Sequence, residues 1–275
     1  MKSLYIFVDS ERPDQYLNSL VYCALRCDVR KVKFVHIKGL GAEGKSIRNI
    51  DGLSGRVMSA VQVQLEGLAE RGEYVFMSGP RSGERVLLKA DPKARATEVQ
   101  LYYKSCRDIA ISYSNEEIDY LDLQRLLKTI AKTERGAYVD ITAIKKRYVG
   151  DIVAAALVEG LAGLYTFDLL SNVQPNFDQP WQNLVHELEA SNQAAFQYVN
   201  IVDTAIYRKC AHTVVVRAPR LAISAISTVA FSTAVALGYW YLGAQSPWTQ
   251  TFFAVSGAAS VLSVMFVFFT PRSSL

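Results

Sequence analysis

The stretch AYVDITAIKKRYVGDIVAAALVEGLAGLYTFDL, residues 137–169, decides the fold class. Residues 137–141 form a short apolar run that is typical of a buried strand. Residues 145–160 are rich in Ala and Val and are long enough for a helix, and residues 163–169 form a second apolar run. This order predicts a βαβ unit, in which the two strands are parallel and the crossover is right-handed.

The same alternation extends toward the N-terminus. Residues 4–8 (LYIFV) and 31–37 (KVKFVHI) predict two strands, and apolar side chains recur at helical spacing over residues 14–26 between them. Because strands and helices alternate up to residue 170, we expect a Rossmann-like α/β domain over 1–175, with a doubly wound, mostly parallel sheet. The other expected elements are helices over 46–71 and 118–132 and strands over 74–77, 85–89 and 109–113, with helix and strand both open over 98–106.

Charge is distributed unevenly along the chain. The 275 residues include 30 Lys and Arg and 26 Asp and Glu, a net charge of +4, but residues 221–270 contain no charged residue and no His. Within that part, residues 221–243 and 251–269 are apolar and long enough to cross a hydrocarbon core of ~30 Å as helices. They predict a two-pass transmembrane hairpin in a C-terminal domain, residues 219–275.

The residues around that hairpin predict its orientation and its connection to the α/β domain. Basic residues precede the first span and Arg272 follows the second, so the positive-inside rule places both termini and the α/β domain in the cytoplasm, with the hairpin in the inner membrane. Apolar residues at helical period predict an amphipathic helical linker over 176–218. Small residues in both spans favour self-assembly, so we expect the lipid bilayer and further copies of the chain as partners, in a homo-oligomer.

Composition also excludes several classes of protein and site. The apolar fraction excludes a disordered chain, and the low cysteine content excludes a small disulfide-rich scaffold. The cysteines have no metal-site spacing, so we expect free thiols and no metal. The modest net charge gives no support for direct binding to duplex nucleic acid. The four cysteines are Cys23, Cys27, Cys106 and Cys210.

The segment GLGAEGKS, residues 39–46, matches the phosphate-loop pattern GxxxxGK[ST]. In such a loop the backbone amides surround a phosphate, the lysine supplies charge and the hydroxyl binds magnesium, which makes Gly44, Lys45 and Ser46 candidate ligand-binding residues. The loop follows the second strand, however, and the next residues include two glycines and an aspartate where a helix would pack on the sheet. Nucleotide hydrolysis, phosphate binding without hydrolysis and a flexible glycine loop all stay open.

A second candidate site lies at the end of the strand over 137–141. Asp140 and Thr142 are followed by Lys145 and Lys146 at the start of a helix, where free backbone amides and the helix dipole favour an anion. Ligands of doubly wound sheets gather at this carboxyl edge, so these four residues are candidate phosphate ligands. Capping of the helix by Asp140 or Thr142, with solvated lysines, explains the same residues equally well.

The loop after the first strand is a third candidate. Asp9 and Ser10 follow the strand over 4–8 and open at the same edge of the sheet, where a carboxylate suits the hydroxyl groups of a ribose. Loops after strands are polar by default, so an ordinary solvated loop explains these residues better than a ligand role does.

The last βαβ unit also resembles a known family. Asp140, Thr142 and Lys146 align with the D-x-T-G-G-T-K turn of CARF domains, with Ala143 and Ile144 in place of its glycines. CARF domains are Rossmann-like sensors of cyclic oligonucleotides in prokaryotic antiviral defence. The resemblance implies a domain that dimerises around a cyclic oligonucleotide and is fused to an effector.

These features together predict a receptor-effector of antiphage defence. A nucleotide-type signal, or a partner protein from the same operon, would act on the sensor domain, and the hairpin would permeabilise or depolarise the inner membrane. No cofactor is expected other than a cyclic oligonucleotide or another nucleotide ligand. Two alternatives stay open: a membrane-tethered, P-loop-like nucleotide-hydrolysing enzyme, and a docking module that recruits a protein partner to the membrane.

Overall fold

The computed structural model describes most of the chain. The described residues are 2–39, 51–77, 79–88, 96–170, 178–190 and 195–211, together with single residues and short pieces between 226 and 255. Contacts divide the chain into two units, Met1–Arg208 and Lys209–Leu275. The first unit holds the sheet and every candidate site residue that the structure describes.

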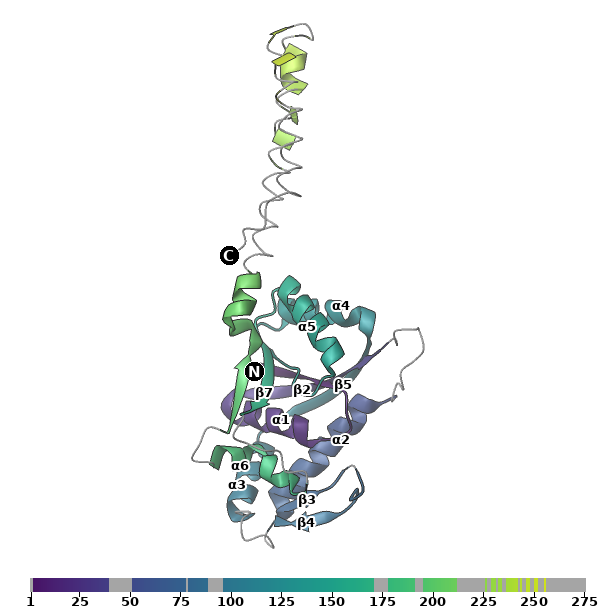
Figure 1. Ribbon diagram of the computed structural model, residues 1–275, viewed down its shortest axis with the longest axis vertical. Coiled ribbons are helices and arrows are strands. Elements are labelled where there is room, and N and C mark those ends of the chain that lie inside the picture. Colours follow the sequence, from purple (N-terminus) through teal and green to yellow (C-terminus); the bar gives the residue numbers. More distant parts are fainter. Residues whose placement is uncertain are drawn as a thin grey trace. The chain divides into compact units, whose positions relative to one another are not determined.

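A six-stranded sheet forms the centre of the first unit (Figure 1), with the strand order β5-β2-β1-β6-β7-β8. The first five strands of this order are parallel to one another, and the sixth, β8, pairs antiparallel with β7. The prediction of a Rossmann-like α/β sheet with parallel strands is therefore confirmed. The bounds are β1 Lys2–Val8, β2 Val29–Lys38, β5 Ser112–Asp119, β6 Tyr138–Asp140, β7 Leu164–Leu169 and β8 Phe196–Asn200.

Helices cover both faces of the sheet (Figure 1). Helices α1 (Asp14–Arg26) and α2 (Leu53–Glu66) pack on one face, and α4 (Leu123–Thr133) and α5 (Lys146–Glu159) pack on the other. Successive side chains of β1 point to opposite faces, so Leu4, Ile6 and Val8 join one core and Tyr5 and Phe7 the other. This two-sided burial explains why the strand is a continuous apolar run instead of an alternating one.

A small additional layer extends the α1 and α2 face. After α2 the chain forms a π-helical turn, η1 (Gly67–Arg71), an antiparallel pair of strands, β3 (Glu73–Val75) and β4 (Arg85–Leu87), and helix α3 (Ala96–Arg107). Helix α6 (Val185–Ala190) packs into the same core. Short 3-10 turns connect other elements: η3 Tyr120–Asp122, η4 Pro180–Asn183 and η5 Ile201–Asp203.

Two local predictions differ from the structure, and one segment that the sequence leaves open is now assigned. The strand expected over 109–113 begins later, as β5, because its polar residues obscure an edge strand that is buried only in part. The segment left open over 98–106 is helix α3. The helical linker expected over 176–218 is wrong where Phe196–Asn200 forms β8, and the boundary between the two units falls after Arg208.

The membrane part of the prediction is also wrong. Among the helices in the described part of the chain, none combines the length and the apolar character that crossing a bilayer requires. A span needs about 20 consecutive apolar residues in one helix. Most of residues 221–243 and 251–269 lies outside the described residues. The two-pass hairpin and the multi-pass inner-membrane location with cytoplasmic termini are therefore withdrawn.

Candidate functional site

The candidate site lies where the strand order changes direction. Strands β1 and β6 are neighbours at the centre of the sheet, but β1 connects onward to β2 on one side and β6 connects onward to β7 on the other. The loops that follow these two strands therefore diverge at the carboxyl edge and leave a crevice between them. Doubly wound sheets bind their ligands at this switch point.

Asp9 and Lys145 join the two loops across that crevice. The Nζ atom of Lys145 lies 2.7 Å from Oδ1 of Asp9, and the backbone N–H of Lys145 donates to Oδ2 at 3.1 Å. The Asp9 side chain is only 6% exposed, whereas that of Lys145 is 53% exposed. Lys145 directly precedes α5, so the Asp9 carboxylate lies at the positive end of this helix. The site thus contains the buried carboxylate of Asp9 beside the solvent-exposed ammonium group of Lys145.

The loop after β1 is held by a buried tyrosine. The hydroxyl oxygen of Tyr16 accepts hydrogen bonds from the backbone amides of Asp9 (3.1 Å) and Ser10 (3.0 Å) and donates to the carbonyl oxygen of Ser10 at 2.9 Å. Burial raises the pKa of Tyr16, so the hydroxyl stays protonated and keeps its donor. The loop is therefore fixed from within α1, and the hydroxyl of the half-buried Ser10 lies 3.4 Å from Oε1 of Gln15 and 3.3 Å from the Tyr16 hydroxyl.

Asp140 lies inside the protein and positions the turn after β6. Its Oδ1 accepts from the backbone N–H of Thr142 at 3.0 Å and its Oδ2 from the hydroxyl of Tyr198 at 2.9 Å. The residue is 1% exposed, and burial raises its pKa above the ordinary range. The Thr142 hydroxyl oxygen in turn accepts from the backbone N–H of Phe167 at 2.8 Å. These bonds connect β6, β7 and β8 and orient the loop that carries Lys145.

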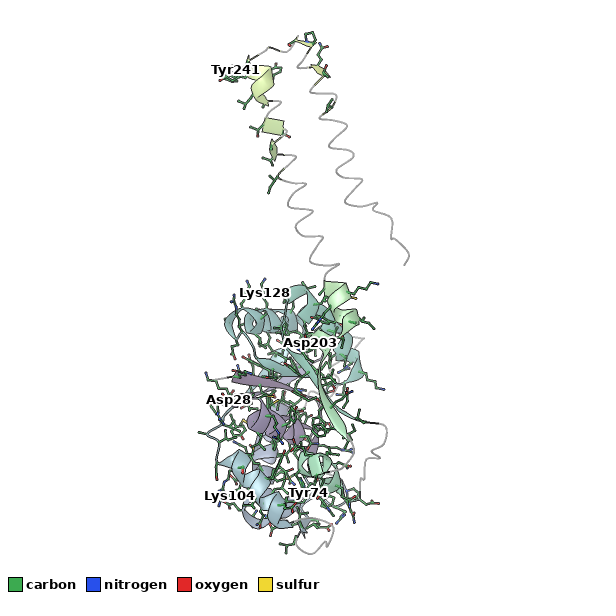
Figure 2. The ribbon with its side chains drawn as sticks, turned by 90° about the vertical axis from the view of Figure 1, so that its left-hand side faces the viewer. Asp28, Tyr74, Lys104, Lys128, Asp203 and Tyr241 are labelled. Carbon is green, nitrogen blue, oxygen red and sulfur yellow. The ribbon has the colours of Figure 1, made fainter. Side chains whose placement is uncertain are left out.

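A cavity of about 350 Å³ opens beside this turn. Thr142 and Phe167 line it from the sheet, and the start of α1 closes another side. A second cavity of about 390 Å³ adjoins it, shares Arg12 and Asp14, and reaches Tyr74 and Phe76 of the additional layer. Tyr74 lies near the end of the first unit that is farthest from Lys128 (Figure 2). The main residues of the first cavity are Arg12, Asp14, Asn18, Thr142, Phe167 and Asn183.

Asp14 is the residue of these walls with the most unusual environment. Its Oδ2 accepts a hydrogen bond of 2.6 Å from the hydroxyl of Tyr74, whereas its Oδ1 is buried and has no hydrogen-bond partner among the described residues. Burial raises the pKa of Asp14 to about 6, against the opposing effects of the Tyr74 hydroxyl and of Arg12. Sequence reasoning missed this residue because an aspartate in the first turn of a helix is ordinary. Its position directly after Pro13, at the helix start that follows the loop of β1, was the available signal.

The other predicted site residues are distributed as follows. Lys146 is exposed at the first position of α5, near the crevice but outside the hydrogen-bond network of Asp140. Gly44, Lys45 and Ser46 lie outside the described residues, so the phosphate-loop prediction stays a prediction. Within the described ranges, no group of three His, Cys, Asp or Glu side chains is arranged to hold a metal ion.

No family model matches the chain, and no curated protein matches it. Among solved structures, the chain is similar to Csm6 from Enterococcus italicus bound to cyclic hexa-2'-fluoro-hexa-dAMP, with a TM-score of 0.38 and 10% sequence identity. The similarity covers 98% of this chain and 57% of the Csm6 chain, so this chain spans little more than half of the length of that protein.

Proposed function

We propose that the first unit is a nucleotide-sensing domain that binds its ligand at the carboxyl edge of the sheet, between the loops after β1 and β6. The cavity of about 350 Å³ at this switch point is the observation that carries the proposal. Its walls include Arg12, which lies in the loop after β1, and Thr142, which lies in the loop after β6. A pocket of this volume has the size of a small-molecule site.

The charges around the cavity suit the two ends of a nucleotide. Arg12 lines both cavities, and the half-exposed ammonium group of Lys145 lies in the loop after β6, so both cations are available to phosphate oxygens. Asp14 supplies a carboxyl group for a ribose hydroxyl or an exocyclic amine. Phe167 adds an apolar wall, on which a base can pack. Arg12 and Asp14 in the walls of one cavity favour a nucleotide over a simple inorganic anion.

The class of nucleotide follows from the CARF-like turn of residues 140–146. That resemblance implies a cyclic oligonucleotide, a dimer of the domain and a role in antiviral defence, and we adopt these as parts of the proposal. The Csm6 chain described above is itself bound to a cyclic hexanucleotide. The alternative of hydrolysis through Gly44, Lys45 and Ser46 falls on residues outside the described part of the chain. If no nucleotide binds, the alternative in which the domain recruits a protein partner is favoured.

Isothermal titration calorimetry on the full chain tests the proposal. The ligands are cyclic tetraadenylate, cyclic hexaadenylate, AMP and ATP. We expect at least one of them to bind, and Arg12→Ala and Lys145→Ala to weaken that binding by roughly tenfold or more, because a hydrogen bond to a charged group contributes about 1.5–3 kcal/mol. Arg125→Ala and Lys128→Ala on α4 are matched controls and should bind as the wild type does. Binding that is equal in all four variants would contradict the proposed site.

A further inference from the structure

A pair of cysteines lies at the opposite end of α1 from the candidate ligand site. Helix α1 begins at the carboxyl edge of the sheet and ends at the amino edge, where Cys23 and Cys27 are one turn apart. The backbone N–H of Cys27 donates to the carbonyl oxygen of Cys23 at 3.0 Å, which closes the helix. Asp28, labelled in Figure 2, then reverses the chain with a φ of 56°. Cys27 is thus the last residue before a sharp turn.

The two thiols differ in exposure and contact one another. Cys23 is fully buried, whereas Cys27 is half-buried and is reached from outside. The two thiols are neighbours one helical turn apart, Cys23 also lies close to the hydroxyl of Tyr198, and Cys27 lies close to that of Tyr138. The Nζ atom of Lys2 lies 3.3 Å from the Tyr138 hydroxyl, so a cation is close to the more accessible thiol.

The surroundings favour the thiolate form of Cys27 and not that of Cys23. The hydrogen bond from Cys23 lowers the pKa of Cys27, and the Tyr138 hydroxyl and Lys2 act in the same direction, against burial. Burial, in contrast, raises the pKa of Cys23. Since the thiolate is the nucleophile, a half-buried thiol beside a cation is the reactive member of such a pair. The titratable groups that face Cys27 are Lys2, Tyr22, Cys23, Tyr138 and Tyr165.

We propose that Cys27 is a peroxide-reactive thiol and that Cys23 is its resolving partner, so that the end of α1 is a reversible redox-modification site. Residues four apart in a helix have Cα atoms about 6 Å apart, within the range that a disulfide bridges. Cys27 ends the helix with a φ of −115°, where the backbone is able to adjust without breaking an inner turn.

The chemistry needs hydrogen peroxide as the oxidant. The Cys27 thiolate attacks one peroxide oxygen, the O–O bond breaks, and the departing hydroxide takes a proton and leaves as water. The sulfur is now a sulfenic acid, and one peroxide molecule has been reduced. Cys23 then loses its proton and attacks the Cys27 sulfur. The S–O bond breaks, the hydroxide leaves with that proton as a second water, and a disulfide remains.

The two other cysteines provide internal comparisons. Cys106 lies in α3 and is buried in the core, and burial raises its pKa to about 12. Cys210 is exposed. Susceptibility to peroxide follows thiolate character together with exposure, and Cys27 combines both.

Peptide mapping of the full chain tests this inference without any nucleotide. Trypsin cleaves after Arg26, so Cys23 and Cys27 fall in separate peptides that only a disulfide joins. After treatment with hydrogen peroxide and alkylation, we expect this crosslinked pair, and its loss on reduction with dithiothreitol. In Cys23→Ala, dimedone should trap a sulfenic acid on Cys27, and Cys210→Ser should behave as the wild type does.

The result that would overturn the inference is equally definite. A peroxide-treated wild-type chain in which Cys23 and Cys27 both remain alkylated as free thiols, or in which Cys27 is oxidised no faster than Cys106 and Cys210, contradicts it. The wild-type experiment needs no variant, so a folding defect in Cys23→Ala, monitored by its melting temperature, leaves the conclusion intact.

Discussion

The ammonium group of Lys145 lies 2.7 Å from the carboxylate of Asp9, although 136 positions separate the two residues in the sequence. Asp9 follows β1 and Lys145 follows β6, so this pair joins the two loops that diverge at the switch point of the sheet. The backbone N–H of Lys145 bonds to the same carboxylate. The edge of the sheet where we propose ligand binding is therefore organised before a ligand arrives.

Asp9→Ala and Lys145→Ala should destabilise the protein to different extents. Asp9→Ala removes both bonds to the start of α5, one of them to a backbone amide, and should cost about 1.5–3 kcal/mol. Lys145→Ala keeps the backbone bond and should cost about 1 kcal/mol or less, as should the exposed control Arg125→Ala. Urea unfolding measures these differences. A larger loss for Lys145→Ala than for Asp9→Ala would contradict the assigned contacts.

Asp140→Ala should be strongly destabilising, because it leaves the Tyr198 hydroxyl and the Thr142 amide without an acceptor. Each such group costs about 1–3 kcal/mol when it is buried. Asp140→Asn retains one oxygen acceptor and should lose less. Tyr198→Phe combined with Asp140→Ala should cost less than the sum of the two single changes, since both remove the same bond. Additive losses would show that the two side chains act independently.

Asp14 should make the stability of the protein depend on pH between about 4 and 6. Its pKa is raised from 3.8 to about 6 by burial, so the folded state holds a proton that the unfolded state has lost. The free energy of unfolding should therefore fall as pH rises through this window, and level off above about 6. Asp14→Asn should remove this slope. Thermal unfolding of both proteins from pH 4 to pH 7 measures it, and parallel curves would contradict the assignment.

Two glycines of the last βαβ unit should respond oppositely to alanine. A Cβ atom at Gly163 would lie 2.6 Å from the carbonyl oxygen of Ala137, so Gly163→Ala should cost about 1–3 kcal/mol. A Cβ atom at Gly150, inside α5, would meet nothing within 4 Å, so Gly150→Ala should stabilise the helix by about 0.5–1 kcal/mol. Chemical denaturation of the two variants in parallel measures their free energies of unfolding. Equal changes in the two variants would contradict this prediction.

The central strands were predictable because burial on both faces leaves a continuous apolar run. Residues 4–8 follow that rule and lie within β1, and residues 137–141 contain β6. The edge strands were not predictable in the same way. Residues 196–200, FQYVN, are only partly buried and mix polar with apolar side chains, so their pattern is also compatible with a helix.

The candidate site could be located from the sequence but not assigned residue by residue. Polar side chains after β1 and β6 indicated the correct edge, since carboxyl ends of parallel strands meet there. The sequence could not show that Asp140 is buried and bonded to Tyr198, because that contact joins strands 58 positions apart. Nor could it show that Asp14 faces Tyr74 across a cavity wall, since the packing of α1 against β3 decides this.

The measurement that tests the central proposal most directly is hydrogen–deuterium exchange of the full chain with and without cyclic hexaadenylate or another nucleotide that binds. We expect slower exchange in residues 9–18 and 141–146, which flank the switch point, and no change in α4. Nucleotide binding that leaves both segments unprotected, or that protects α4 instead, would contradict the proposed site.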